Sequence, residues 1–382
     1  MNEIAIYFHW PFCKSKCPYC DFASFCSKDA SLYEKFGDYF LEDLKRSVAA
    51  IGDKHIKSMF FGGGTPSLMN PQSIAKILDF LSKNYHIKDD VEVTLEANPA
   101  TFDKNKMQNF KNAGINRLSL GIQSFLDDHL KFLGRIYNGK QALKAAEIVS
   151  GVFKNFSFDF MYGYECQTET TLEQDLLRAV RFGCKHISCY QLTFEKNTVF
   201  YDNLLVGNIK QIDENKEVKL YEHIEDILKN HNIFRYEVSN YSMLGFESKH
   251  NLAYWQYDDY LGIGPSAHSR VTINKNKNEM VKIRDPFLWE SALNQNKTTF
   301  SYINTLTEKE QLKEAILMGL RLISGITIND LYRKISRETV DRVISKRKMK
   351  FLRQKKLMTQ KNIQLTNVGL QKMDSVVEFL LN

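Results

Sequence analysis

The sequence predicts an α/β protein: a partial parallel (β/α)6 barrel followed by a C-terminal winged-helix-like domain. In residues 1–238, six short β-rich runs alternate with helical stretches, which implies a parallel sheet with right-handed crossovers. In residues 306–382, a helix, a second helix, a short hairpin and a final helix follow one another. We interpret residues 239–305, an aromatic stretch that contains Asn and Lys, as a linking region.

The barrel strands are expected where short runs of β-branched, aromatic and aliphatic residues lie between helical stretches. They are Ile4–Phe8, Ile56–Phe61, Val91–Leu95, Arg117–Leu120, Phe156–Phe160 and Ile187–Leu192, with a seventh candidate at Phe234–Val238. Helical stretches between them include Pro71–Asn84, Lys140–Val152 and Thr170–Phe182. Six such units over about 200 residues suit a barrel or partial barrel better than a small open sheet.

The C-terminal domain begins with a predicted helix at Thr307. Thr307 and Glu310 fit a capping box, apolar residues then recur at helical spacing, and Gly325 suits the helix exit. A helix over Thr339–Gln354, a hairpin over Leu357–Leu365 and a last helix from Thr366 complete the winged-helix pattern.

Composition places the chain among ordinary globular proteins. Of its 382 residues, 43% are hydrophobic and 25% charged, and the net charge of +7 does not by itself imply a nucleic-acid partner. We see no apolar run of about 18 residues and no export signal, so we expect a cytoplasmic protein. The seven cysteines are odd in number and three crowd together, which favours a metal or redox site over a disulfide framework.

The most specific motif is the C-x3-C-x2-C run of Cys13, Cys17 and Cys20, expected in a loop after the first strand. Three thiolates on one loop can hold three irons of a 4Fe-4S cluster and leave the fourth iron open. The alternative is a zinc site in which His9 joins the three cysteines. Lys14 and Lys16 are expected to favour ionised thiols. The other four cysteines, Cys26, Cys166, Cys184 and Cys189, are expected to be small buried hydrophobes.

Polar residues or glycines follow the predicted strands at their carboxyl ends, where parallel barrels place their active sites. The triple glycine Gly62–Gly64 allows close backbone approach to a ligand, but no phosphate-loop sequence follows it. Burying Asp159 and Gln123 on apolar strands is costly without partners, which favours a site. The residues at this rim are Gly62, Gly63, Gly64, Thr65, Glu96, Gln123, Asp159 and Tyr162.

Together these features resemble the radical S-adenosylmethionine superfamily, and more closely the branch that contains oxygen-independent coproporphyrinogen III oxidase and the heme chaperone HemW. The resemblance rests on Tyr7-x-His9-x-Pro11-Phe12-Cys13, the cysteine loop, Gly62–Ser67, Glu96-x-x-Pro99, Gly121-x-Gln123-Ser124, Leu133-Gly134-Arg135, Asp159-x-x-Tyr162-Gly163 and Gly319-Leu320-Arg321-Leu322. It implies that S-adenosylmethionine binds the open iron and is cleaved to methionine and a 5′-deoxyadenosyl radical. It also implies contacts to a first S-adenosylmethionine from Tyr7, Gly63 and Glu96, and to a second from Tyr19, Gly64, Thr65, Gln123, Arg135 and Asp159.

Two features favour the HemW side of this branch. The oxidase carries a further cysteine two residues past the third, whereas Asp21-Phe22 follows Cys20 here. His250-Asn251-Leu252-Ala253-Tyr254-Trp255 matches the H-N-x-x-Y-W stretch that HemW-like proteins use for heme, which implies His250 as an axial ligand. The family usually has Leu-Pro after Tyr162-Gly163, but this chain has Tyr164-Glu165.

The resemblance implies a protein that carries the cluster, binds heme and transfers it to acceptor hemoproteins, at times at the membrane periphery. An electron donor such as flavodoxin or ferredoxin is implied as a partner. The alternative within the branch is coproporphyrinogen III oxidase activity, the decarboxylation of two propionates.

An alternative of another class, a zinc-stabilised winged-helix protein that binds nucleic acid, rests on residues 342–361, which contain nine Lys and Arg and no acid. Val340, Val343, Ile344 and Phe351 recur there at helical spacing, so we favour the solvated face of a packed helix and do not expect a nucleic-acid partner. The same charge could contact an acidic protein or an anionic membrane.

Overall fold

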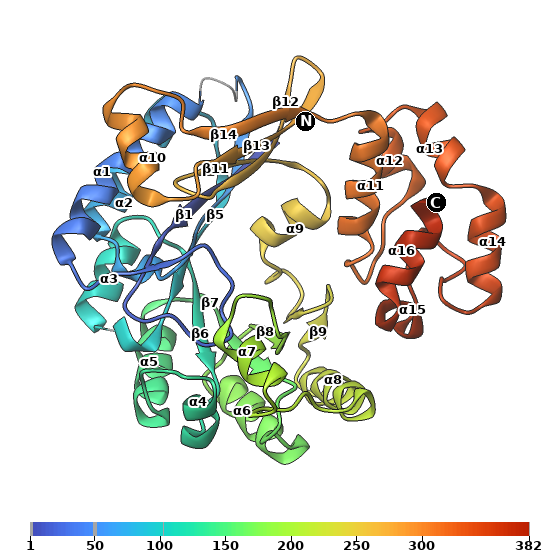
Figure 1. Cartoon of the computed structure of the whole chain (residues 1–382), viewed down its shortest axis with the longest axis horizontal. Coiled ribbons are helices and arrows are strands. Elements are labelled where there is room, and N and C mark those ends of the chain that lie inside the picture. Colours follow the sequence, from blue (N-terminus) through green and yellow to red (C-terminus); the bar gives the residue numbers. More distant parts are fainter. Residues whose placement is uncertain (1–2, 49–51, 102, 382) are drawn as a thin grey trace.

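A computed structural model of the chain describes residues 3–48, 52–101 and 103–381. Its centre is a 12-stranded sheet, ordered β14-β13-β12-β11-β1-β4-β5-β6-β7-β8-β10-β9 (Figure 1). Six neighbouring strands pair in parallel, and each contains one of the predicted strands or nearly all of it. They are β1 (Glu3–Trp10), β4 (His55–Gly63), β5 (Ile87–Ala97), β6 (Arg117–Gln123), β7 (Asn155–Tyr162) and β8 (His186–Gln191).

Helices connect these strands and cover the outer face of the curved sheet (Figure 1). The start of α2 (Pro71–Asn84) is fixed by Asn70, whose side chain accepts from the Gln72 N–H, and by Pro71 in the first turn. α5 (Gly139–Val152) and α6 (Glu169–Arg181) begin with capping boxes and agree with the prediction to within a residue. The remaining helices of this part are α1 (Ala30–Ser47), α3 (Lys104–Asn112), α4 (Asp127–Phe132), α7 (Val199–Leu205) and α8 (Glu214–Lys229).

The stretch 239–305, expected to link two domains, instead extends the sheet. β11 (Asp259–Ile263) pairs in parallel with β1, and β12 (His268–Ile273), β13 (Asn276–Lys282) and β14 (Phe300–Thr305) follow as antiparallel strands. Asn274 and Lys275, both at positive φ, form the tight turn between β12 and β13. The same stretch contains β10 (Asn240–Ser242), α9 (Lys249–Trp255) and α10 (Pro286–Asn294). The seventh strand candidate is reduced to β9 (Phe234–Arg235).

The C-terminal residues form a helical unit with its own core, located to one side of the barrel (Figure 1). The predicted capping box is present at Thr307 and Glu310, but α11 (Glu308–Gly319) ends before Gly325. The helix predicted over Thr339–Gln354 is two helices, α13 (Arg337–Val343) and α14 (Lys346–Gln354), because Ser345 caps the second. An antiparallel bridge joins Met358 to Leu365 at the predicted hairpin, and a second bridge joins Ile363 to Ile326, outside it. The other helices are α12 (Ile328–Tyr332), α15 (Asn367–Gln371) and α16 (Met373–Leu381).

Polar contacts join this unit to the sheet. Glu314 on α11 accepts hydrogen bonds from Arg270 (2.8 Å) and from the Tyr257 hydroxyl (2.8 Å). Lys334 donates to Asp258 at 2.5 Å. None of the helices within the described residues is long and apolar enough to cross a membrane.

Candidate functional site

The cysteine loop leaves the carboxyl end of β1 and contacts the ends of the neighbouring strands. Cys13 ends the short strand β2 (Phe12–Cys13) and is buried, and its sulfur accepts a hydrogen bond from Thr65 Oγ1 at 3.3 Å. Cys17 and Cys20 are half-buried and lie in one turn, closed by the Cys20 N–H donating to the Cys17 carbonyl at 3.1 Å. All three thiols are free of disulfides.

Gly63 and Gly64 are needed because this end of β4 packs directly on the cysteine loop. The Gly64 N–H donates to the Trp10 carbonyl at 2.6 Å, and the Thr65 N–H donates to the Phe12 carbonyl at 2.9 Å. A Cβ on Gly64 would lie 2.7 Å from the Phe12 oxygen and 3.1 Å from the Cys13 sulfur. Gly63 adopts φ +109°, which side chains disfavour. The close approach expected toward a ligand is therefore made, in the first place, toward the cysteine loop.

Two predicted carboxylic acids, Glu96 and Asp159, lie inside the barrel near this loop. Glu96 Oε2 accepts from the Gly63 N–H at 3.2 Å, and burial together with the nearby Asp159 raises the pKa of Glu96 to about 8. Asp159 accepts from Ser119 Oγ at 2.8 Å, and burial raises its pKa. Tyr7, the predicted contact on β1, is hydrogen-bonded to His9 Nδ1 at 3.1 Å. These acids hold a proton more readily than free carboxyls, and a cationic group bound beside them would favour their ionised form.

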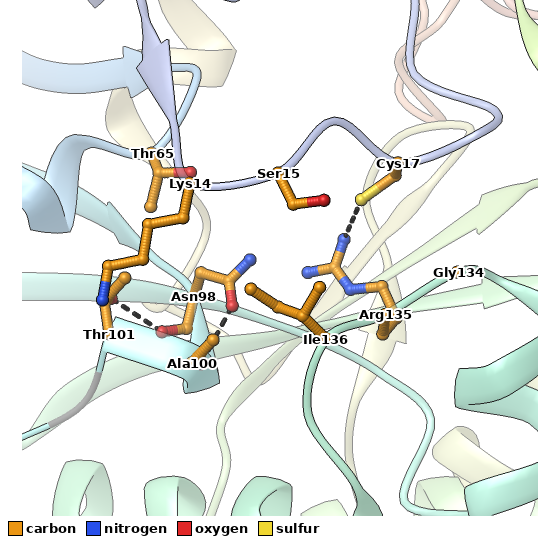
Figure 2. A pocket seen from close by; sticks show the side chains of 10 residues that line it. All are labelled: Lys14, Ser15, Cys17, Thr65, Asn98, Ala100, Thr101, Gly134, Arg135 and Ile136. Carbon is orange, nitrogen blue, oxygen red and sulfur yellow. Dashed lines mark hydrogen bonds between the residues drawn. The ribbon is translucent and has the colours of Figure 1, made fainter. Parts of the chain in front are cut away.

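Arg135 connects the cysteine loop to the end of β6. Its Nη1 donates to the Cys17 sulfur at 3.0 Å and to the Tyr19 hydroxyl at 3.1 Å. The contact with Cys17 is the dashed line in Figure 2. The Nε of Arg135 donates to Tyr137, whose hydroxyl donates to the Gly121 carbonyl at 2.8 Å. Tyr137 was not among the expected residues; its only signal is its position two residues after Arg135. The predicted Gln123 ends β6 with φ +63°, an uncommon conformation for a residue with a side chain.

A pocket lies between the cysteine loop and these strand ends (Figure 2). Of the predicted residues it brings together Cys17, Thr65 and Arg135, but neither Asp159 nor His250. The lining also includes Lys14 and Gly134, which the sequence placed beside the thiols and in the Leu133-Gly134-Arg135 motif. It includes Asn98 as well, and four residues for which the sequence predicted no contact, namely Ser15, Ala100, Thr101 and Ile136. The positions of Asn98 and Thr101, shortly after the strand end at Glu96, could have indicated that both lie at the rim of the barrel. The lining is polar and carries two cationic side chains, so the pocket suits an anionic or carboxylate-bearing group.

The donor set of the loop fits an iron–sulfur cluster better than zinc. Both nitrogens of His9 are engaged, Nδ1 with Tyr7 and Nε2 with the Ala23 carbonyl at 2.9 Å, so His9 could complete a Cys3His site only by breaking one of these hydrogen bonds. In the described part of the chain, no three His, Cys, Asp or Glu side chains converge on a point that could hold one ion. Thiolates of a four-iron cluster bind different iron atoms and need no such convergence.

Burial, rather than the neighbouring lysines, controls the protonation of the Cys13 and Cys20 thiols. It raises the pKa of Cys13, and it raises that of Cys20 to about 11, although Lys16 acts in the opposite direction. The expectation that Lys14 and Lys16 keep the thiols ionised is therefore not met for Cys13 and Cys20 in the metal-free chain. Binding of iron has to displace these protons.

His250, on α9 (Lys249–Trp255), is only 1% exposed, and its ring lies beside that of Tyr7 with centroids 6.2 Å apart. Its Nδ1 is hydrogen-bonded to Ser58 Oγ at 3.0 Å and its Nε2 to the Tyr254 hydroxyl at 2.9 Å. Its ring stacks on Phe60 with centroids 4.9 Å apart. Burial, with Lys57 and Arg117 adding to it, lowers the pKa of His250 to about 3. The imidazole is neutral, as an axial ligand must be, but Tyr254 occupies the nitrogen that would bind iron.

The helix that carries His250 is held by a buried acid that sequence analysis missed. Glu92, on β5, accepts from the backbone N–H groups of Lys249 and His250, both at 3.1 Å, and from Ser248 Oγ at 3.3 Å. A carboxylate at the start of a helix satisfies its free N–H groups. Glu92 thereby fixes α9 against the barrel.

Comparison with known proteins agrees with this arrangement. The family model of the radical SAM superfamily matches residues 7–179. The chain is 37% identical over 349 residues to the heme chaperone HemW of Buchnera aphidicola subsp. Schizaphis graminum, which covers 84% of this chain and 92% of that protein. It is 36% identical over 275 residues to HemW of Escherichia coli, 71% of each chain.

The structure is similar to that of coproporphyrinogen III oxidase from Escherichia coli, a radical SAM enzyme. The TM-score is 0.81 with 17% identity, and the match covers 99% of this chain and 90% of the other. At this identity the likeness concerns the fold alone, and it confirms the predicted fold class.

Proposed function

We propose that this chain, which belongs to the HemW family of the radical SAM superfamily, is a heme chaperone. It binds heme and transfers it to acceptor hemoproteins. The observation that carries the proposal is the 37% identity to a HemW protein over 92% of its length. Two features of the sequence support it further: Asp21-Phe22 stands where the oxidase has its extra cysteine, and the His250 stretch is present.

Membership of the superfamily implies a 4Fe-4S cluster and S-adenosylmethionine. Cys13, Cys17 and Cys20 would hold the cluster, which when bound supplies one electron for reductive cleavage of S-adenosylmethionine. Within the chain, Arg135 orients Cys17, and Glu96 offers a carboxyl to a cationic amine or sulfonium. The predicted contacts of Tyr7, Gly63 and Glu96 with one S-adenosylmethionine, and of the residues around Arg135 with a second, remain part of the proposal.

For heme, we propose His250 as the axial ligand, which requires Tyr254 to release the Nε2 atom. Breaking that hydrogen bond opposes heme binding by about 0.5–1.5 kcal/mol. Tyr254→Phe keeps the ring but frees the nitrogen, so heme affinity should rise roughly two- to tenfold. His250→Phe should abolish the nitrogen-ligated heme spectrum.

Heme titration of the wild type and both variants, followed by absorption, tests this assignment. A His250→Phe variant that binds heme like the wild type removes His250 as the ligand. Transfer is tested separately, by mixing heme-loaded chain with an apo-hemoprotein and following recovery of the acceptor's spectrum. A wild-type chain that binds heme but does not transfer it to the acceptor would refute the chaperone function itself.

The oxidase alternative is supported only by likeness in fold. An anaerobic assay with coproporphyrinogen III, the reconstituted chain, S-adenosylmethionine and a one-electron donor such as reduced flavodoxin distinguishes the two. Formation of protoporphyrinogen would overturn our preference.

We place delivery in the cytoplasm and at anionic membranes, where α14 would make the contact. Its exposed face carries Lys346, Arg347 and Lys350, and beside them Phe351, 43% exposed, packs on Phe379, 38% exposed, with ring centroids 5.0 Å apart. Basic residues next to exposed aromatic rings suit an anionic lipid surface, each contributing about 1 kcal/mol.

Reversing two charges in Lys346→Glu/Lys350→Glu should lower partition onto phosphatidylserine vesicles by about 30-fold or more. The control reverses Lys140 and Lys144, which are exposed at the same spacing on α5. Equal loss in both variants, or equal binding to neutral vesicles, would refute a specific contact.

A further inference from the structure

Cys26, which the function above leaves unused, lies beside the cluster ligand Cys13. The short strands β2 and β3 (Phe25–Cys26) pair in parallel with Cys13 directly opposite Cys26. Hydrogen bonds from the Phe25 N–H to the Pro11 carbonyl (2.7 Å) and from the Ser27 N–H to the Cys13 carbonyl (3.0 Å) hold this register.

This register places two thiols within bonding reach. Paired strand positions lie about 4.8 Å apart and present their side chains on the same face. A disulfide bridges Cα atoms separated by about 4.4–6.8 Å.

The two thiols differ in access to solvent. Cys26 was expected to be a small buried hydrophobe, but it is exposed, as is Cys166, whereas Cys184 and Cys189 are buried as expected. Cys13 is only 9% exposed. An oxidant from solution therefore meets Cys26 first, and Cys13 is the neighbour able to resolve the product. An accessible cysteine next to a resolving cysteine is the usual arrangement of a redox-sensitive pair.

We propose that Cys13 and Cys26 form a reversible disulfide when the cluster is lost under oxidising conditions. A peroxide oxidises the Cys26 thiol to a sulfenic acid and is reduced to water or an alcohol. The Cys13 sulfur then attacks the Cys26 sulfur, the S–S bond forms, and the S–O bond breaks with release of water. Two thiols have lost two electrons to one peroxide, and two equivalents of a small thiol return them.

The consequence concerns the cluster, and this part rests on the proposed role of Cys13 as a ligand. A Cys13 sulfur in a disulfide cannot bind iron, so the cluster cannot be rebuilt until a thiol reductant opens the bond. With the cluster in place, Cys13 is held by iron and the disulfide does not form. The pair would thus tie cluster assembly to a reducing cell interior and spare Cys13 from irreversible oxidation.

The test uses the full-length, cluster-free chain treated with hydrogen peroxide, alkylated and mapped by peptide mass spectrometry. We expect a Cys13–Cys26 linkage, loss of two of the seven thiols, and loss of iron uptake that dithiothreitol reverses. In Cys26→Ser, Cys13 should stay open to alkylation and iron uptake should survive the same treatment. Cys166→Ser, which alters the other exposed cysteine, should behave like the wild type.

A linkage of Cys13 to Cys17 or Cys20, or equal loss of Cys13 in Cys26→Ser, would overturn the proposal. So would peroxide treatment that produces no disulfide. Iron uptake and heme titration of the reduced chain are measured in parallel. Failure of those two would instead count against the proposed function, and the disulfide map would stand on its own.

Discussion

Replacing His250 with Phe should lower the free energy of unfolding by about 2–4 kcal/mol at pH 7. The ring and its stacking on Phe60 are kept, while both hydrogen bonds of the imidazole are lost. Ser58 is fully buried, so its unpaired hydroxyl costs about 1–3 kcal/mol. Tyr254 is only partly buried, and losing its bond costs about 0.5–1.5 kcal/mol.

The difference in the free energy of unfolding between the wild type and His250→Phe should shrink as the pH falls. In the unfolded chain His250 takes up a proton near its ordinary pKa of 6.5, whereas burial keeps the folded imidazole neutral down to a pKa of about 3. The unfolded state therefore binds more protons over this interval, and the stabilisation due to His250 is lost as pH decreases. At pH 4.5 the loss amounts to about 2.7 kcal/mol, since each unit corresponds to about 1.36 kcal/mol. The two proteins should then be almost equally stable.

Urea unfolding of the cluster-free wild type and variant at pH 7 and pH 4.5, followed by tryptophan fluorescence and circular dichroism, measures this difference. Other buried histidines, such as His186, are present in both proteins and cancel. Tyr254→Phe is the control, because it loses one hydrogen bond but keeps the buried imidazole, so its deficit of about 1 kcal/mol should not change with pH. A His250→Phe deficit that stays constant from pH 7 to 4.5 would refute a buried, neutral His250.

Three further predictions follow from packing and charge. Gly64→Ala places a Cβ 2.7 Å from the Phe12 oxygen, so it should lower the free energy of unfolding by about 1–3 kcal/mol and reduce iron uptake. The control Gly151→Ala, in α5 with open space around it, should be neutral or stabilising in the same unfolding and iron assays. Equal effects of the two variants would contradict the packing argument. Asp43→Asn breaks a fully buried ion pair with Lys282 (2.7 Å) and should lower the free energy of unfolding, measured in urea, by about 3–5 kcal/mol. Asp38→Asn, on the same helix, removes an exposed ion pair and should lower it by under about 1 kcal/mol. A larger loss for Asp38→Asn would refute the buried Asp43–Lys282 pair. The pKa of Glu96 is raised from the ordinary value of 4.5 to about 8 in the folded chain, so the wild type loses stability as pH rises through this interval, where only the unfolded chain releases the proton. Glu96→Gln should therefore gain stability relative to the wild type between pH 5 and pH 9. Thermal melts that show the opposite trend would exclude a buried, proton-retaining Glu96.

The parallel strands were predictable because each is covered on both faces and forms a short apolar run. Their polar ends were not: β5 begins at Ile87, and the acidic residues that follow, such as Asp90, carry no strand signal. β13 and β14 were missed because most of their residues are polar or exposed. β14, at the sheet edge, leaves almost all of its side chains in solvent. By contrast, Val271–Ile273, the β-branched end of β12, carries a local strand signal.

Within the site, motifs placed the residues but not their partners. The triple glycine was noticed, yet its contact with the Phe12 carbonyl depends on how β4 lies against the cysteine loop. The pairing of Glu92 with the start of α9 joins residues more than 150 positions apart, so no local pattern could announce it. His250 was found by its motif, while its burial between Ser58 and Tyr254 comes only from the tertiary structure.

The central claim is a chain that carries an iron–sulfur cluster on Cys13, Cys17 and Cys20 and also binds heme. Iron, acid-labile sulfide, zinc and heme should be quantified on one anaerobically reconstituted preparation, with Cys17→Ala measured alongside. We expect about four non-heme irons and four sulfides for each chain, together with bound heme, and loss of the cluster irons in the variant. One zinc per chain without sulfide, or a preparation that takes up no heme, would contradict the account.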